Sequence, residues 1–84
     1  MAYQVLIKRS AEKELDAFSP NLRSRIIARL LKLENDPRPS GIKKLQGQEA
    51  FRLRVGDYRV LYTIDDAEQI VMVFAIGHRR EVYR

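Results

Sequence analysis

The stretch that decides the fold reads Phe51-Arg52-Leu53-Arg54-Val55-Gly56-Asp57-Tyr58-Arg59-Val60-Leu61-Tyr62. Apolar residues alternate with arginine in its first half, which predicts a β-strand, and Gly56-Asp57 supplies a two-residue turn whose glycine can take a positive φ. A two-residue loop fixes the register of the two strands. The sequence therefore predicts a hairpin whose apolar face pairs Val55 with Tyr58, Leu53 with Val60 and Phe51 with Tyr62.

The other face of this hairpin carries three arginines: Arg52, Arg54 and Arg59. In the predicted register Arg54 and Arg59 are direct cross-strand neighbours, and like charges placed opposite one another destabilise a sheet. A bound anion would remove this cost. The planar guanidinium group matches phosphate oxygens in pairs, so the pairing predicts a phosphate-binding surface.

Length and composition limit the rest of the interpretation. With 84 residues the chain is expected to form one small domain, 1–84, around a single modest core. It has no cysteine, so a disulfide framework and a thiolate metal site are both excluded. No apolar run approaches the roughly 20 residues of a membrane span, and the N-terminus lacks the basic-then-apolar layout of a secretion signal. We therefore expect a cytoplasmic protein without membrane association.

The charge balance favours polyanionic partners. The formal net charge is +5 and the isoelectric point is about 9.9. Basic residues are concentrated between residues 38 and 59, in the hairpin and the segment that leads to it. Nucleic acid or an acidic protein would suit such a surface.

The elements in chain order are a strand within residues 1–8, a short helix capped by Ser10, a second helix from Ser19-Pro20 to about Asn35, a loop, the hairpin, and a final strand over 69–76. The final strand is apolar on both faces, which places it inside a sheet. The expected fold class is α+β with the order β-α-α-β-β-β, an antiparallel sheet with both N-terminal helices packed on one face. The arginine face would then be left open to solvent.

Two features of the second helix have alternative interpretations. Ile27 and Leu31 widen its apolar arc, and we expect the first helix to cover them, although a partner site is the alternative. Arg25, Arg29 and Lys32 recur at i, i+4 and i+7, a pattern that is more typical of a solvated helix face than of RNA contact.

Most catalytic motifs are absent from the chain. One histidine and no cysteine exclude a His/Cys metal cage, and no glycine-rich phosphate loop occurs, so neither a metal nor a cofactor is expected. Fixed cations suit phosphate-ester chemistry by charge stabilisation and positioning. RNA supplies its own nucleophile in the 2′-hydroxyl group, so such a surface could act on RNA.

The hairpin stretch, together with the tail His78-Arg79-Arg80-Glu81-Val82-Tyr83, resembles the RelE branch of the RelE/ParE toxin superfamily. The segments Asn35-Asp36-Pro37 and Lys44-Leu45-Gln46-Gly47 match as well. The resemblance implies a metal-independent, ribosome-dependent endoribonuclease that cuts messenger RNA in the A site. It also implies a cognate acidic antitoxin that neutralises the toxin, in a toxin–antitoxin hetero-oligomer.

By this resemblance the catalytic residues are Arg52, Arg54, Arg59, Arg79 and Tyr83. Lys43, Lys44 and Arg80 are predicted to bind RNA. The best-known family members have lysines at the positions of Arg52 and Arg54. Because arginine stays protonated, acid–base duty would move to Tyr83 or to His78, whose unperturbed pKa lies near neutrality. His78 could instead pack on the end of the last strand.

Two other functions remain open from the sequence. A ParE-like toxin that inhibits DNA gyrase by binding shares the fold, and an inactive homologue could bind only the antitoxin or nucleic acid. The basic set of the open face favours the nuclease. An antitoxin could lie across the basic surface or along the second helix.

Overall fold

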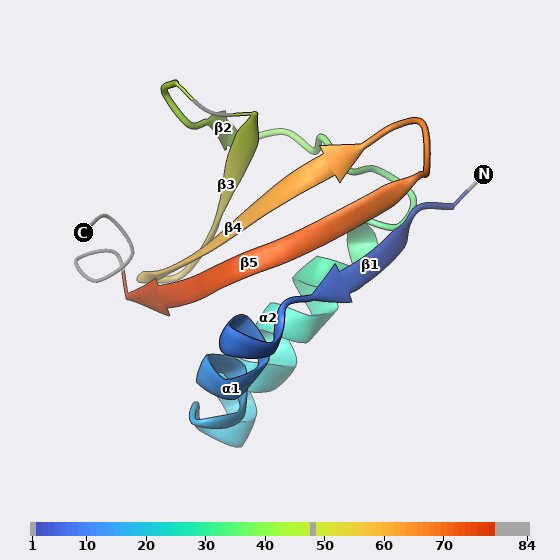
Figure 1. The fold of residues 1–84 in the computed structure, drawn as a ribbon. Coiled ribbons are helices and arrows are strands. Elements are labelled where there is room, and N and C mark those ends of the chain that lie inside the picture. The colour runs from blue at the N-terminus through green and yellow to red at the C-terminus, as the bar shows by residue number, and fades with distance from the viewer. Residues whose placement is uncertain (1, 48, 79–84) are drawn as a thin grey trace.

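The computed structural model describes residues 2–47 and 49–78, which form two helices and a five-stranded sheet. The sheet order is β1-β5-β4-β3-β2, and Figure 1 shows both helices on the same side of it. In chain order the elements are β1 (Gln4–Ile7), α1 (Arg9–Asp16), α2 (Pro20–Lys32), β2 (Lys43–Lys44), β3 (Ala50–Val55), β4 (Tyr58–Asp65) and β5 (Ile70–His78). The predicted α+β fold with two helices on one face is confirmed, with β2 as an additional short strand.

The sheet is mixed, so the prediction of a purely antiparallel sheet was wrong. β1 pairs in parallel with β5, with Val5 beside Val71 and Ile7 beside Val73, while the other neighbours are antiparallel. The alternating pattern of β1 specifies which residues face the core and carries no information on strand direction. Because β1 and β4 occupy both edges of β5, the doubly apolar β5 lies inside the sheet as predicted.

The helix ends agree only in part with the sequence. α1 begins at Arg9 after Lys8, which makes no side-chain capping bond, so the predicted Ser10 cap was wrong. α2 begins as predicted: Ser19 Oγ accepts a hydrogen bond from the Leu22 amide at 3.4 Å, and Pro20 is the first helical residue. α2 ends at Lys32, earlier than expected, because the next amides bond three residues back.

The core lies between the helices and the covered face of the sheet. Ala11 and Leu15 of α1 and Ile26, Leu30 and Leu33 of the α2 segment pack with buried residues of the three long strands: Leu53, Val55, Val60, Tyr62, Val71, Val73 and Ile76. This layer fixes which face of the hairpin points to the helices and leaves the arginine face on the other side.

The cover predicted for the second helix is missing. Ile27 is 39% exposed and Leu31 is 54% exposed. The eight residues of α1 pack mainly over β5, so they do not extend across the outer side of α2. The expectation that α1 buries this pair was therefore wrong.

In the described part of the chain, neither helix has the length and apolar character that crossing a membrane requires.

Candidate active site

The hairpin has the register that its sequence predicts. Val55 pairs with Tyr58, Leu53 with Val60 and Phe51 with Tyr62. Gly56 has a φ of +61°, whereas the φ of Asp57 is not positive. A positive φ at the first central residue alone is the pattern of a type II′ turn, whose twist suits a two-residue hairpin.

Four basic side chains share the open face. Arg54 and Arg59 are direct cross-strand partners, as predicted, and Lys43 of β2 lies opposite Arg52 of β3. Each position alternates with a residue of the covered face, so all four project away from the helices. Arg54 is exposed, and its Nε donates a hydrogen bond to the carbonyl oxygen of Gly56 at 3.0 Å. The open face is thus a basic surface built on three strands.

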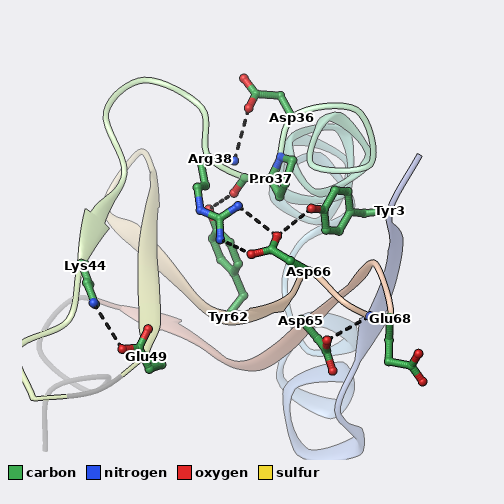
Figure 2. Close-up of polar contacts among 10 residues, drawn as sticks. All are labelled: Tyr3, Asp36, Pro37, Arg38, Lys44, Glu49, Tyr62, Asp65, Asp66 and Glu68. Carbon is green, nitrogen blue, oxygen red and sulfur yellow. Dashed lines mark hydrogen bonds and ion pairs between the residues drawn. The ribbon is translucent and has the colours of Figure 1, made fainter. Parts of the chain in front are cut away.

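The structure separates the two lysines that were predicted to bind RNA. Lys44 is paired with Phe51, which places it on the opposite face from Lys43. Its Nζ lies 3.4 Å from a carboxylate oxygen of Glu49, and both side chains are exposed (Figure 2). Lys43 therefore joins the basic open face, whereas Lys44 is turned away and already has an acidic neighbour.

His78 also lies on the covered side. It is the cross-strand partner of Tyr58, and the two rings meet edge-on with centroids 5.7 Å apart. Tyr58 in turn packs on Phe18 at 5.0 Å. Arg59 is paired with Gly77, so the arginine and the histidine point to opposite sides of the sheet. This placement agrees with the alternative in which His78 packs on the strand end.

Arg79, Arg80 and Tyr83 lie outside the described residues. Their roles remain predictions from the resemblance.

The basic rows border an apolar strip that the sequence analysis did not identify. Leu61 lies between Arg52 and Ala75 on the open face and is only 6% exposed, and Met72 lies in the next row, opposite Thr63. The doubly apolar sequence of β5 was the signal for such a strip. Because this strip lies beside the arginines, the open face presents apolar surface as well as positive charge.

A polar network holds the loop that leads to Lys43 (Figure 2). Arg38 donates two hydrogen bonds to the carboxylate of Asp66, at 3.2 and 2.9 Å, and the Tyr3 hydroxyl donates a third at 2.6 Å. The Arg38 guanidinium also lies 5.8 Å from the centre of the Phe51 ring. The hydrogen bonds from Arg38 and then Tyr3 lower the pKa of Asp66, and the bond to Asp66 raises the pKa of Tyr3.

A buried hydrogen bond from β4 also holds this loop in place. The Tyr62 hydroxyl donates to the carbonyl oxygen of Pro37 at 2.9 Å, and burial raises the pKa of Tyr62 to about 12. Two consequences follow for the site. The loop ends at Lys43, which lies opposite Arg52. Arg38 belongs to the basic residues by sequence, but its charge is neutralised by Asp66.

The described part of the chain contains no group of three histidine, cysteine, aspartate or glutamate side chains that could hold a metal ion. The open face carries fixed positive charges beside the apolar strip, and these charges can bind and stabilise phosphate groups.

Comparison with known proteins assigns this small α+β protein with a basic open sheet to a class of bacterial and archaeal toxins. A family model described as "ParE toxin of type II toxin-antitoxin system, parDE" matches residues 5–83. The toxin RelG of Mycobacterium tuberculosis is 31% identical over 87 residues, which cover 100% of this chain and 99% of RelG. The chain belongs to the RelE/ParE superfamily of toxins of type II toxin–antitoxin systems.

Solved structures agree with this assignment. The archaeal RelE–RelB complex from Pyrococcus horikoshii matches with a TM-score of 0.85 at 26% identity, over 96% of this chain and 99% of that one. The toxin–antitoxin complex RelBE2 from M. tuberculosis matches with a TM-score of 0.83 at 27% identity, over 94% and 100%. The isolated RelE toxin of E. coli matches with a TM-score of 0.82 at 26% identity, over 98% and 92%.

Proposed function

We propose that the protein is a metal-independent endoribonuclease that cuts messenger RNA in the ribosomal A site and is neutralised by an acidic antitoxin. The observation that carries the proposal is the direct pairing of Arg54 with Arg59 on an open face that also holds Arg52 and Lys43. Guanidinium groups match phosphate oxygens in pairs, and RNA offers a row of phosphates to such a surface.

In the proposed reaction the 2′-hydroxyl oxygen of RNA attacks the adjacent phosphorus atom, and the bond to the 5′-oxygen of the next nucleotide breaks. Arg59 and Arg79 bind the scissile phosphate, and Arg52 and Arg54 stabilise the extra negative charge of the transition state and hold the RNA backbone. The proton of the 2′-hydroxyl must leave, and the departing oxygen must gain one. Arginine does neither well because its side chain stays protonated.

The position of His78 affects which residue can transfer that proton. Its ring contacts Tyr58 on the covered side of the sheet, while Arg59 faces the open side. Tyr83 is therefore the stronger candidate for the acid–base role. With so few such groups, alignment of the substrate must come from a larger partner, and we expect RNA without ribosomes to be cut poorly.

The proposed partner follows from charge and from the relatives. Several similar toxins were solved in complex with RelB antitoxins. A net charge of +5 favours an acidic antitoxin here, in a hetero-oligomer that covers the toxin. The basic open face is the surface that such an antitoxin must cover or distort to block RNA.

A second candidate function rests on the matching family model, which is named for ParE toxins. In that case the protein would inhibit DNA gyrase by binding, without cutting RNA. An inactive homologue that only binds the antitoxin would do neither.

One experiment separates these functions. The protein is induced in cells, the ends of messenger RNA are mapped by primer extension, and gyrase supercoiling is assayed in parallel. The nuclease predicts cuts in phase with codons that vanish in Arg59→Ala and Arg79→Ala and persist in Lys13→Ala, a matched loss of charge on exposed α1. Intact transcripts with blocked supercoiling would replace the nuclease by the gyrase inhibitor, and the absence of both effects would indicate the inactive homologue.

A further inference from the structure

We infer that Arg25 and the basic side of α2 form a second RNA-binding surface, which takes the phosphate backbone of double-stranded RNA and adjoins the open face at the end of the hairpin. The inference rests on the proposed function in that RNA is the partner. It adds a surface on the helix layer that no catalytic role requires.

Guanidinium groups from two layers of the fold meet at the hairpin turn. The two terminal nitrogens of Arg25, on α2, lie 3.5 and 4.0 Å from the position that a Cβ atom would take on Gly56. From the open face, Arg54 donates to the carbonyl oxygen of the same glycine at 3.0 Å. Gly56 has no side chain, so the turn leaves room for Arg25 to approach. The basic surface thus continues around the hairpin end from the sheet to α2.

The hairpin turn contains one acid, Asp57, which forms no ion pair with Arg25 or Arg54. Neither Arg25 nor Arg54 forms an ion pair with a carboxylate in residues 2–47 and 49–78, in contrast to Arg38 and Lys44. Both guanidinium groups are exposed at the same turn, and each can donate hydrogen bonds to phosphate oxygens.

The basic stripe of α2 extends this surface. Arg25, Arg29 and Lys32 share one side of the helix, at about 100° per residue, while the exposed pair Ile27 and Leu31 lies on another side, over 100° away from Arg25. A protein helix docked on α2 would bury that apolar pair. The stripe beside the hairpin offers charge alone, which suits a phosphate backbone better. The sequence by itself favoured a solvated face for this stripe, and the contact of Arg25 with the hairpin end changes that interpretation.

The same surface distinguishes double-stranded from single-stranded RNA. Proteins bind single strands by stacking bases on exposed aromatic rings, and every tyrosine and phenylalanine in the described part of the chain is buried or only partly exposed. Double-stranded RNA is recognised mainly through its shape, phosphates and 2′-hydroxyl groups. A row of arginine and lysine on a convex helix and turn fits that mode of contact.

The test uses the full-length protein and a fluorescent RNA hairpin with a stem of about 16 base pairs, the length of duplex that a shape-specific RNA-binding domain spans. Binding is measured against salt concentration for the wild type, Arg25→Ala, Arg25→Glu and the control Lys13→Glu. Arg25→Ala should weaken binding several-fold and reduce the slope of log K against log salt by about 0.9, the value for one lost phosphate contact. Arg25→Glu should weaken it further, and Lys13→Glu should lie close to the wild type.

The same variants are assayed for ribosome-dependent cleavage, so that the two proposals can fail separately. A wild type that cleaves messenger RNA while both Arg25 variants bind the stem like Lys13→Glu would overturn the second site and leave the nuclease intact. A wild type that does not cleave while stem binding depends on Arg25 would do the reverse. If Arg25→Glu weakens binding of polyglutamate and leaves the RNA stem unaffected, the site belongs to an acidic protein and the inference is wrong. Thermal unfolding of each variant checks that the fold is retained.

Discussion

The direct pairing of Arg54 with Arg59 should be measurable as an unfavourable coupling energy in the folded protein. The perturbation is a double-mutant cycle of Arg54→Ala, Arg59→Ala and the double variant. Each single change also removes other contacts, such as the hydrogen bond from Arg54 to Gly56, and these losses cancel in the cycle. What remains is the interaction between the two side chains.

The register sets the magnitude of this coupling. Cross-strand partners have Cβ atoms about 5 Å apart, and two charges some 7 Å apart on such side chains repel by about 0.6 kcal/mol in water and more in a poorer dielectric. We therefore expect an unfavourable coupling of about 0.5–1 kcal/mol at about 0.01 M salt. At about 1 M salt the screening length falls to roughly 3 Å, and the coupling should nearly vanish.

The assay is urea unfolding of the four proteins at both salt concentrations, with a second cycle of Arg54→Ala and Lys13→Ala as the control. Residues on separate elements without a shared partner should be additive within about 0.5 kcal/mol. Inorganic phosphate should make the Arg54–Arg59 coupling less unfavourable than chloride of equal ionic strength does. A coupling near zero or favourable at low salt would refute the reasoning, because the two guanidinium groups would then have no need of an anion.

Three further predictions concern the loop between α2 and Lys43. Tyr62→Phe removes the buried bond to Pro37 and should lower the free energy of unfolding by about 1–3 kcal/mol, whereas Tyr58→Phe should change it by less than about 0.5 kcal/mol; equal losses in chemical denaturation would contradict this role of Tyr62. Because the pKa of Tyr62 is raised to about 12 from 10.0, its contribution is complete below pH 10 and is lost as the pH rises toward 12, a loss that Tyr62→Phe should not show. The pKa of Asp66 is lowered from 3.8, mainly by Arg38, so its contribution is present above that pH and is lost as the pH falls below it. Asp66→Asn should flatten this acid dependence of the unfolding midpoint, and an unchanged dependence would show that the pair with Arg38 does not stabilise the fold.

The sequence determined those features that depend on near neighbours in the chain. The turn of Gly56-Asp57 allows one register, and that register alone places Arg54 opposite Arg59 and the apolar residues on the other face. Ser19 and Pro20 likewise mark the start of α2, because capping depends on atoms within one helical turn. The family resemblance was also carried by contiguous segments, and the comparisons confirm it.

Tertiary structure decided what depends on contacts between distant parts of the chain. β1 could join the sheet in either direction by its pattern, and its parallel pairing with β5 is a contact between segments far apart in the sequence. Lys43 and Lys44 are adjacent in sequence, yet the pairing of β2 with β3 puts them on opposite faces. Arg38 is neutralised by Asp66, which lies 28 residues further along the chain.

The same limit applies to the candidate site. Its hairpin half was predictable because two strands joined by a two-residue turn fix each other's side chains. Three other features result from packing between elements. His78 faces Tyr58, Leu61 and Ala75 form an apolar strip, and Arg25 lies beside the hairpin end. The sequence thus determined which charges the open face carries, because charge follows from composition. The fold decided which of these charged side chains act together, because their distances depend on how the helices and strands pack.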